Sequence, residues 1–322
     1  MRRVQDIAWP IIGLGAVAVS SWLLFKELRG LSYASLRDAF GSISPGRWVM
    51  ACVSTIVAYS ALAWYDRIAL LHLGRKISWP FVALTSFVTY AIAHNLGASV
   101  LSGAVIRYRA YSTRGLTVTD VGLLVAFCSF TFVLGAVTLG GLLLLIHPDL
   151  VERFEGAPDW VGQAAGVALI AAPCLYVLGS LLHFRSFRIA GFELTYPRPP
   201  IAARQLLAGP LELVGAAGII FFTLPTANPG FVVVLGVFIA SFCLALVSHA
   251  PGGLGVLEIA FLSGVPDAPQ ANVVAALLAF RLLYLILPLV FSLAVVLVFE
   301  RHRWHSLVLL GAKRAHARND QD

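Results

Sequence analysis

Charged side chains inside long apolar stretches are the residues of this sequence best suited to chemistry. Asp66, Glu212 and Arg281 lie in such stretches, whereas Glu258 lies within one shorter apolar segment and Arg107 near the end of another. A charge at the centre of a membrane helix costs about 2.5–3.5 kcal/mol on insertion scales. Asp66, Arg107, Glu258 and Arg281 are therefore expected to converge on one cavity, where they neutralise one another or a charged ligand. Structural ion pairs, or side chains that reach the interface, are the alternative, and that alternative is strongest for Arg67 and Arg109.

A glycine-rich break precedes one of these carboxylates, in the run Ser248-His-Ala-Pro-Gly-Gly-Leu-Gly-Val-Leu-Glu258. Proline and glycine disfavour a continuous helix and allow close approach of a ligand or another helix. A tight turn before a packed helix is the alternative. The run is not a nucleotide loop, because it contains neither GxGxxG nor GKS or GKT. Turns at membrane depth are expected at Gly97, Pro251, Gly252, Gly253 and Gly255.

Patterns typical of catalysis or of metal binding are missing from the sequence. It contains no HExxH and no GxSxG, so no catalytic residue, metal or cofactor is expected. His94 and His249 are isolated, and a capping or core role is favoured over a ligand role. The four cysteines lie in apolar stretches and are expected to be small buried hydrophobes: Cys52, Cys128, Cys174 and Cys243.

The elements that carry these residues are expected to be membrane helices. Apolar residues make up 59% of the 322-residue chain and charged residues only 12%, about half the charged share of a soluble domain. A span needs about 20 mostly apolar residues, and backbone in lipid must be helical. Met1-Arg2-Arg3 and the first stretch are expected to be a retained helix rather than a signal peptide. The predicted spans are Ile7–Phe25, Trp48–Leu71, Trp79–Asn95, Val121–Ile146, Val161–His183, Gln205–Leu224, Phe231–Ala250 and Asn272–Phe299.

The charges of the loops predict an orientation. The net charge of +7 comes from basic loops beside spans, which argues against nucleic acid and for cytoplasmic loops. Eight crossings would place the basic segments 184–204 and 301–322 on opposite sides. Two short apolar segments, Leu96–Tyr108 and Gly253–Val265, supply the missing crossings as half-helices of about 20 Å each. Both termini are then cytoplasmic and the acidic loop 147–160 is outside; only Lys26–Arg47 disagrees.

Weak internal similarity predicts a duplication. His94-Asn-Leu-Gly97 aligns with His249-Ala-Pro-Gly252, although biased composition could produce the same match. Because the two half-helices would enter from opposite sides, the expected fold is all-α: about eight full spans and two broken half-helices in an inverted repeat. The repeat halves are about 1–150 and 151–300 within one transmembrane domain, and 301–322 is a basic, then polar, cytoplasmic tail.

Several motifs resemble the membrane region of lysylphosphatidylglycerol synthases/flippases, whose stand-alone versions are called YbhN-like. The resemblance covers about residues 8–300 and implies that Asp66, Arg107, Glu258 and Arg281 match functional positions of the family. It adds Arg109 and Tyr284 as candidates for substrate binding or translocation. The motifs are Pro251-Gly-Gly-Leu-Gly-Val-Leu-Glu258, Arg281-Leu-Leu-Tyr284-Leu-Ile-Leu-Pro288, Gly103-Ala-Val-Ile-Arg107-Tyr-Arg109-Ala-Tyr111 and Trp64-Tyr-Asp66.

The resemblance implies a protein of the cell inner membrane that moves a phospholipid or lipid-linked headgroup between leaflets. The implied partners are an anionic or aminoacylated phospholipid, a second copy of the chain, or a lipid-synthesis enzyme. Lysyl transfer from tRNA is not expected, because only a short tail follows Glu300 where full-length members carry a soluble transferase domain. A subunit or enzyme of aminoacyl-phospholipid, hopanoid or glycolipid modification, and a scaffold without transport, are the alternatives.

Overall fold

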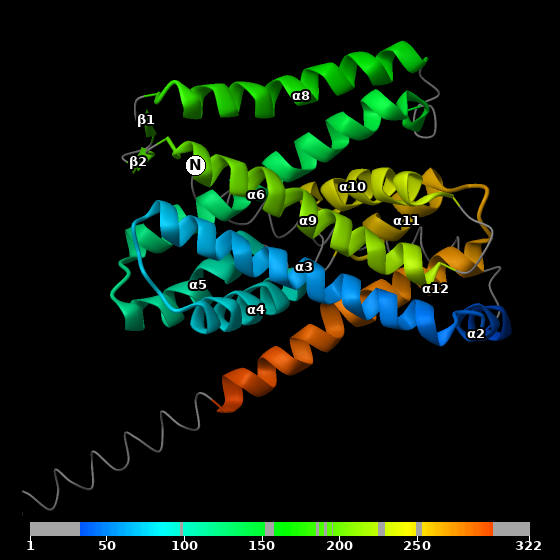
Figure 1. Ribbon diagram of the computed structural model, residues 1–322. Helices are drawn as coiled ribbons and strands as arrows, with labels where there is room; N and C mark the ends of the chain where they lie inside the picture. Colours follow the sequence, from blue (N-terminus) through cyan, green and yellow to red (C-terminus); the bar gives the residue numbers. More distant parts are fainter. Residues whose placement is uncertain are drawn as a thin grey trace, which may run out of the picture.

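The computed structural model is a helical bundle (Figure 1). It describes residues 33–96, 99–151, 158–184, 187–189, 192–194, 196–224, 229–248 and 253–298. The principal helices are α2 (Tyr33–Gly41), α3 (Pro45–His72), α4 (Trp79–Leu96), α5 (Ser99–Tyr111), α6 (Val118–Ile146), α8 (Asp159–Leu181), α9 (Pro199–Thr223), α10 (Phe231–Val247), α11 (Val256–Gly264) and α12 (Gln270–Phe280).

Five helices of the described residues are long and apolar enough to cross a membrane. They are α3, α6, α8, α9 and the continuous helical stretch Gln270–Val298, which begins with α12. Two other predicted spans form shorter elements: α4 has 18 residues and α10 has 17. The predicted first span, Ile7–Phe25, lies outside the described residues. A helical membrane protein is therefore confirmed, whereas the count of eight full spans is not.

Short connecting elements complete the chain. They are the 3-10 helices η1 (Ser112–Arg114) and η2 (Pro148–Leu150) and the strands β1 (Phe187–Ile189) and β2 (Phe192–Leu194). The strands form an antiparallel hairpin in which Phe187 faces Leu194. The expectation of a purely α-helical chain missed this hairpin, which lies in the predicted basic loop.

Contacts between the helices define the two ends of the bundle. Arg75 bonds to Asp120 at 2.9 Å, which brings the α3–α4 connection to the start of α6. At the other end of α6, Leu150 of η2 packs beside Gly236 of α10. We call these the Arg75 end, with residues 73–78, 112–117, 182–184 and 196–198, and the Asp149 end, with residues 42–44, 147–151, 229–230 and 265–269.

Two helical hairpins enter the bundle from opposite ends (Figure 1). The hairpin α4–α5 opens at the Arg75 end, and the hairpin α10–α11 opens at the Asp149 end. Helix α4 ends at Leu96 and α5 begins at Ser99, so α5 begins and ends three residues later than the predicted segment Leu96–Tyr108. Gly97, His249, Pro251 and Gly252 lie outside the described residues. Gly253 and Gly255 have φ values of 63° and 78°, a region that suits glycine, and α11 therefore starts only at Val256.

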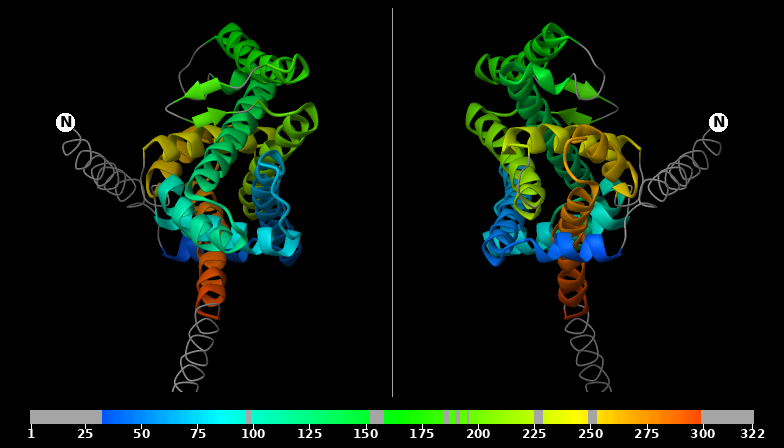
Figure 2. Two further views of the ribbon diagram at one scale, coloured as in Figure 1. Left: turned by 90° about the vertical axis from the view of Figure 1, so that its left-hand side faces the viewer. Right: turned by 90° about the vertical axis from the view of Figure 1, so that its right-hand side faces the viewer.

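Glycines bring the three central helices into backbone contact. A Cβ added to Gly135 of α6 would lie 2.5 Å from the backbone of Gly209 of α9. A Cβ added to Gly215 of α9 would lie 2.7 Å from the backbone nitrogen of Ala58 of α3. Small residues allow such close packing where apolar burial does not drive helices together. The other elements surround this unit: α8 lies on one side, and the last turns before Val298 project from the opposite side (Figure 2).

Candidate functional site

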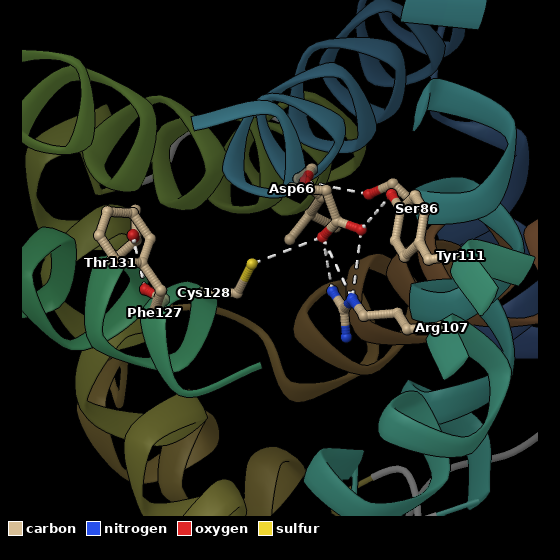
Figure 3. A network of polar contacts seen from close by, with 8 residues as sticks. Asp66, Ser86, Arg107, Tyr111, Phe127, Cys128 and Thr131 are labelled. Carbon is tan, nitrogen blue, oxygen red and sulfur yellow. Dashed lines mark hydrogen bonds and ion pairs between the residues drawn. The ribbon is translucent and has the colours of Figure 1, made fainter. Parts of the chain in front are cut away.

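The first charged pair joins α3 to α5 (Figure 3). Arg107 donates to Asp66 through Nη2 at 2.7 Å and through Nε at 3.2 Å from each carboxylate oxygen. Asp66 is fully buried and Arg107 is 4% exposed. A buried pair of this kind persists only when further hydrogen bonds satisfy its remaining atoms.

Neighbouring side chains supply those bonds. The Tyr111 hydroxyl, one turn after Arg107 on α5, donates to Asp66 Oδ2 at 2.9 Å. The Cys128 thiol of α6 points to Asp66 Oδ1 at 3.5 Å. The guanidinium carbon of Arg107 lies 4.7 Å from the centre of the Tyr90 ring of α4, which is cation–π geometry. Asp66 therefore connects three helices, and the ring of a fourth covers the cation.

The second charged pair joins α11 to the helix that follows α12. Arg281 contacts Glu258 Oε1 through Nε and through Nη2, each at 2.5 Å. Glu258 Oε2 accepts the backbone N–H of Gly255 at 2.8 Å. Glu258 thus stabilises the start of α11 with one oxygen and holds Arg281 with the other. A carboxylate in the first turn also suits the positive end of the helix dipole.

The helix is π-helical from Arg281 to Ile286, directly after α12. A π segment interrupts the usual pattern of backbone hydrogen bonds and often occurs at functional sites. Side chains from two other helices bond to its carbonyls: Tyr59 of α3 donates to Tyr284 O at 2.9 Å and Asn95 of α4 donates to Leu285 O at 3.1 Å. The segment is therefore held by α3 and by the end of α4.

A third buried acidic group lies at this π segment. The Tyr284 hydroxyl donates to Glu212 Oε1 of α9 at 2.6 Å, and both side chains are buried. The ring of His94 stacks on the ring of Tyr284, with centres 5.4 Å apart. His94 in turn contacts Tyr90, whose ring lies under Arg107. Ring contacts thus connect Glu212 and Tyr284 to the first charged pair.

The four charged residues that were expected to converge on one cavity do not meet in one place. Asp66, Arg107, Glu258 and Arg281 form two ion pairs rather than one cluster. Arg109 is exposed on α5 and lies on another face of the helix than Arg107, because it is two positions further along. His94 and Glu212 meet at Tyr284. A surface groove of about 330 Å³ lies apart from both pairs and is lined by Ser60, Ala61, Trp64, Arg67, Trp79 and Leu211.

The cysteines correct another expectation. Cys128 is buried, but Cys52 and Cys174 are exposed and Cys243 is partly exposed. The exposed ones lie on membrane-length helices, where the surface that faces lipid is as apolar as the interior. Among the described residues, no group of three or more His, Cys, Asp or Glu side chains could hold a metal ion.

Sequence reasoning missed Tyr90, Cys128 and Tyr59 as partners of the site. Tyr111 had a signal, because it lies four residues after Arg107 and shares its helix face. Tyr90 has the same spacing before His94. Cys128 and Tyr59 gave no signal, since each meets its partner only through contacts between distant segments.

A bundle of apolar helices, with an ion pair from each of two opposed hairpins to a neighbouring helix, defines a class of polytopic membrane protein. Sequence similarity identifies the family within that class. Residues 11–292 match the family described as the lysylphosphatidylglycerol synthase TM region, and the chain belongs to that family. It is 29% identical to the inner membrane protein YbhN of Escherichia coli K12 over 308 residues, which are 92% of this chain and 87% of YbhN.

Two further relatives show how the family varies in length. An uncharacterized protein of Synechocystis is 28% identical over 297 residues, which are 89% of this chain and 90% of that protein. A phosphatidylglycerol lysyltransferase of Staphylococcus aureus strain COL is 24% identical over 278 residues, 84% of this chain but only 31% of the lysyltransferase. The chain therefore matches a minor part of the lysyltransferase and nearly all of the other two.

Proposed function

We propose that this protein translocates a phospholipid or lipid-linked headgroup between the leaflets of the inner membrane. The observation that carries the proposal is the placement of two carboxylate–guanidinium pairs, one buried and one partly buried. Each pair joins one of the hairpins that enter from opposite ends to a neighbouring helix. Each pair brings both signs of charge to a helix that is short for a membrane span. A headgroup that crosses the membrane needs such groups in place of its hydration.

The chemistry of exchange favours an anionic or aminoacylated phospholipid. An arginine that leaves its carboxylate can hold a phosphate with two parallel hydrogen bonds. The carboxylate released in that step can accept an ammonium group of the same headgroup. Partner exchange of this kind keeps every buried charge neutralised throughout the crossing. Asp66, Arg107, Glu258 and Arg281 would carry it, with Tyr284 between the two pairs.

The proposed architecture is an inverted repeat with both termini in the cytoplasm. The opposed hairpins α4–α5 and α10–α11 support it, and so do the basic residues Arg75, Lys76, Arg114 and Arg198 at the Arg75 end. In this architecture the chain has eight full spans and two half-helices.

Cysteine labelling checks the orientation. In a protein with Cys52 and Cys174 replaced by alanine, we expect Ser112→Cys to react with an impermeant maleimide only from the cytoplasmic side. Asp149→Cys, at the other end of α6, should react only from outside. Labelling of both positions from the same side would contradict the architecture.

Reconstitution tests the function directly. Purified protein in vesicles of phosphatidylglycerol and phosphatidylcholine, with a trace of fluorescent phosphatidylglycerol or lysyl-phosphatidylglycerol, should expose inner-leaflet probe to an external quencher. Protein-free vesicles and vesicles with the double variant Asp66→Asn, Glu258→Gln are the controls. Equal quenching of all three preparations would reject translocation of these lipids.

A subunit or enzyme of lipid modification is the second candidate, since one relative carries the name phosphatidylglycerol lysyltransferase. That candidate predicts a partner, either a lipid-synthesis enzyme or a second copy of this chain. Product formation from phosphatidylglycerol by the purified protein, without movement between leaflets, would favour it.

A further inference from the structure

Glu212 differs from the other two buried acidic residues of the site. Asp66 and Glu258 each pair with an arginine, whereas no ion pair between described residues includes Glu212. Its side chain is 1% exposed, and Tyr284 donates to one of its oxygens. The other oxygen, Oε2, has no hydrogen-bond partner in the described part of the chain.

Among the described residues, no cation pairs with Glu212 in that place. The titratable side chains on the elements packed around it include tyrosines and a cysteine. Tyr284 of the π segment donates to the carboxyl, and the Tyr59 ring of α3 packs on the Tyr284 ring. Tyr65 of α3 donates to the carbonyl of Gly209, three residues before Glu212, and Cys243 lies on α10, which packs against α9. On the α6 and α8 side, Thr131 and Tyr176 instead bond to Gln205, two turns earlier on α9. His94 reaches the site only by stacking on Tyr284.

An uncompensated carboxylate in such a place costs several kcal/mol. A buried acidic residue of a membrane helix therefore marks a path for ions or protons by default. The described residues around it offer no second carboxylate and no group of metal ligands. The ligand that fits one unpartnered carboxylate oxygen among hydroxyl groups is a single proton.

We propose that Glu212 binds the proton that drives this transporter. In the step, Oε2 accepts a proton from water on one side of the membrane and releases it to water on the other. Tyr284 keeps its hydrogen bond to Oε1 in both forms. The coupling to lipid movement rests on the proposed function, whereas the binding of the proton does not.

The position of Tyr284 explains how the charge of Glu212 would reach both ion pairs. Arg281, three residues earlier in the same π segment, holds Glu258 on the α10–α11 hairpin. The His94 ring on Tyr284 belongs to the α4–α5 hairpin, and Arg107 lies on α5. A change of charge at Glu212 acts on the hydroxyl of Tyr284 and thereby on the element that both hairpins contact.

Infrared difference spectroscopy of the protein in lipid nanodiscs tests proton binding without transport. Between acidic and alkaline buffer, the wild type should show the C=O stretching band of a buried carboxylic acid. Glu212→Gln should lose that band, while the exposed control Asp149→Asn keeps it. In Tyr284→Phe the band should shift rather than vanish, because one hydrogen bond is lost. A spectrum of Glu212→Gln that retains the band overturns the proposal.

A pH gradient across the vesicle membrane tests the coupling. One pH unit is worth a tenfold ratio per proton, about 1.4 kcal/mol, so it supports up to about tenfold lipid asymmetry between leaflets. The asymmetry should reverse when the gradient is reversed. In Glu212→Gln the ratio of lipid between the two leaflets should be about one, which means no asymmetry. Wild-type movement that ignores the gradient would overturn the coupling. No movement of lipid by wild type would instead count against the proposed function, and the infrared result would still decide proton binding.

Discussion

Replacement of Arg107 by alanine, with Asp66 in place, is expected to lower the free energy of unfolding by about 3–5 kcal/mol. The reason is that Asp66 is fully buried and would keep a charge without its cation. Thermal unfolding in lipid nanodiscs measures the change. Arg109→Ala is the matched control: two residues further along α5, this side chain is exposed, and its loss should change stability by about 0.5 kcal/mol or less.

The same pair allows a double-mutant cycle. The double variant Asp66→Asn, Arg107→Met removes both charges. The amide oxygen at position 66 can still accept the hydrogen bond of the Tyr111 hydroxyl, so most of the lost stability should return. Lipid movement should not return, because the exchange of charged partners is gone. Equal losses of stability for Arg107→Ala and Arg109→Ala would show that the buried pair contributes nothing special. Recovery of lipid movement in the double variant would limit the pair to a structural role.

The second large effect is expected from Arg281→Lys, which keeps the charge but removes the planar fork. Arg281 donates a hydrogen bond from Nε to Glu258 Oε1 and places Nη2 2.5 Å from the same oxygen, whereas the single nitrogen of a lysine cannot occupy both positions. A hydrogen bond to a charged group is worth about 1.5–3 kcal/mol, so the rate of lipid movement should fall about 10- to 100-fold. The vesicle quenching assay measures this rate.

Arg67→Lys is the control for that experiment. Arg67 donates to the carbonyl of Ile77 near the Arg75 end, a single bond to a neutral acceptor that lysine can also make. Its rate should stay within about twofold of wild type. If the two lysine variants behave alike, the geometry of the guanidinium at position 281 has no part in the movement of lipid.

The positions of the helices could be predicted from the sequence because hydropathy measures what lipid demands. The predicted and observed bounds of α6, Val121–Ile146 and Val118–Ile146, differ by three residues at one end only. The number of full spans could not be predicted in this way. The apolar segment Trp79–Asn95 reads like a crossing helix, yet it forms one half of a hairpin with α5, and only contacts between helices reveal that.

The site could be predicted as a set of charges but not as a set of pairs. Two carboxylates and two arginines allow more than one pairing, and the sequence carries no record of which helices adjoin. Glu212 illustrates the same limit. Its apolar neighbours in sequence signal a buried charge, but its bond to Tyr284, 72 positions away, follows from tertiary packing. No pattern in the sequence predicts the π segment that orients Tyr284.

The glycine contacts of α9 restrict how this molecule could change shape. Gly209 touches Gly135 of α6, and Gly215 touches Ala58 of α3, with no room for one methyl group. Any side chain that entered these contacts would collide with the facing backbone, so a rotation that brings a larger residue to the interface is blocked. We therefore expect helices α3, α6 and α9 to move together, with Asp66 and Glu212 at a fixed separation. A change of access to the two sides of the membrane would then come from hairpins that swing against this block.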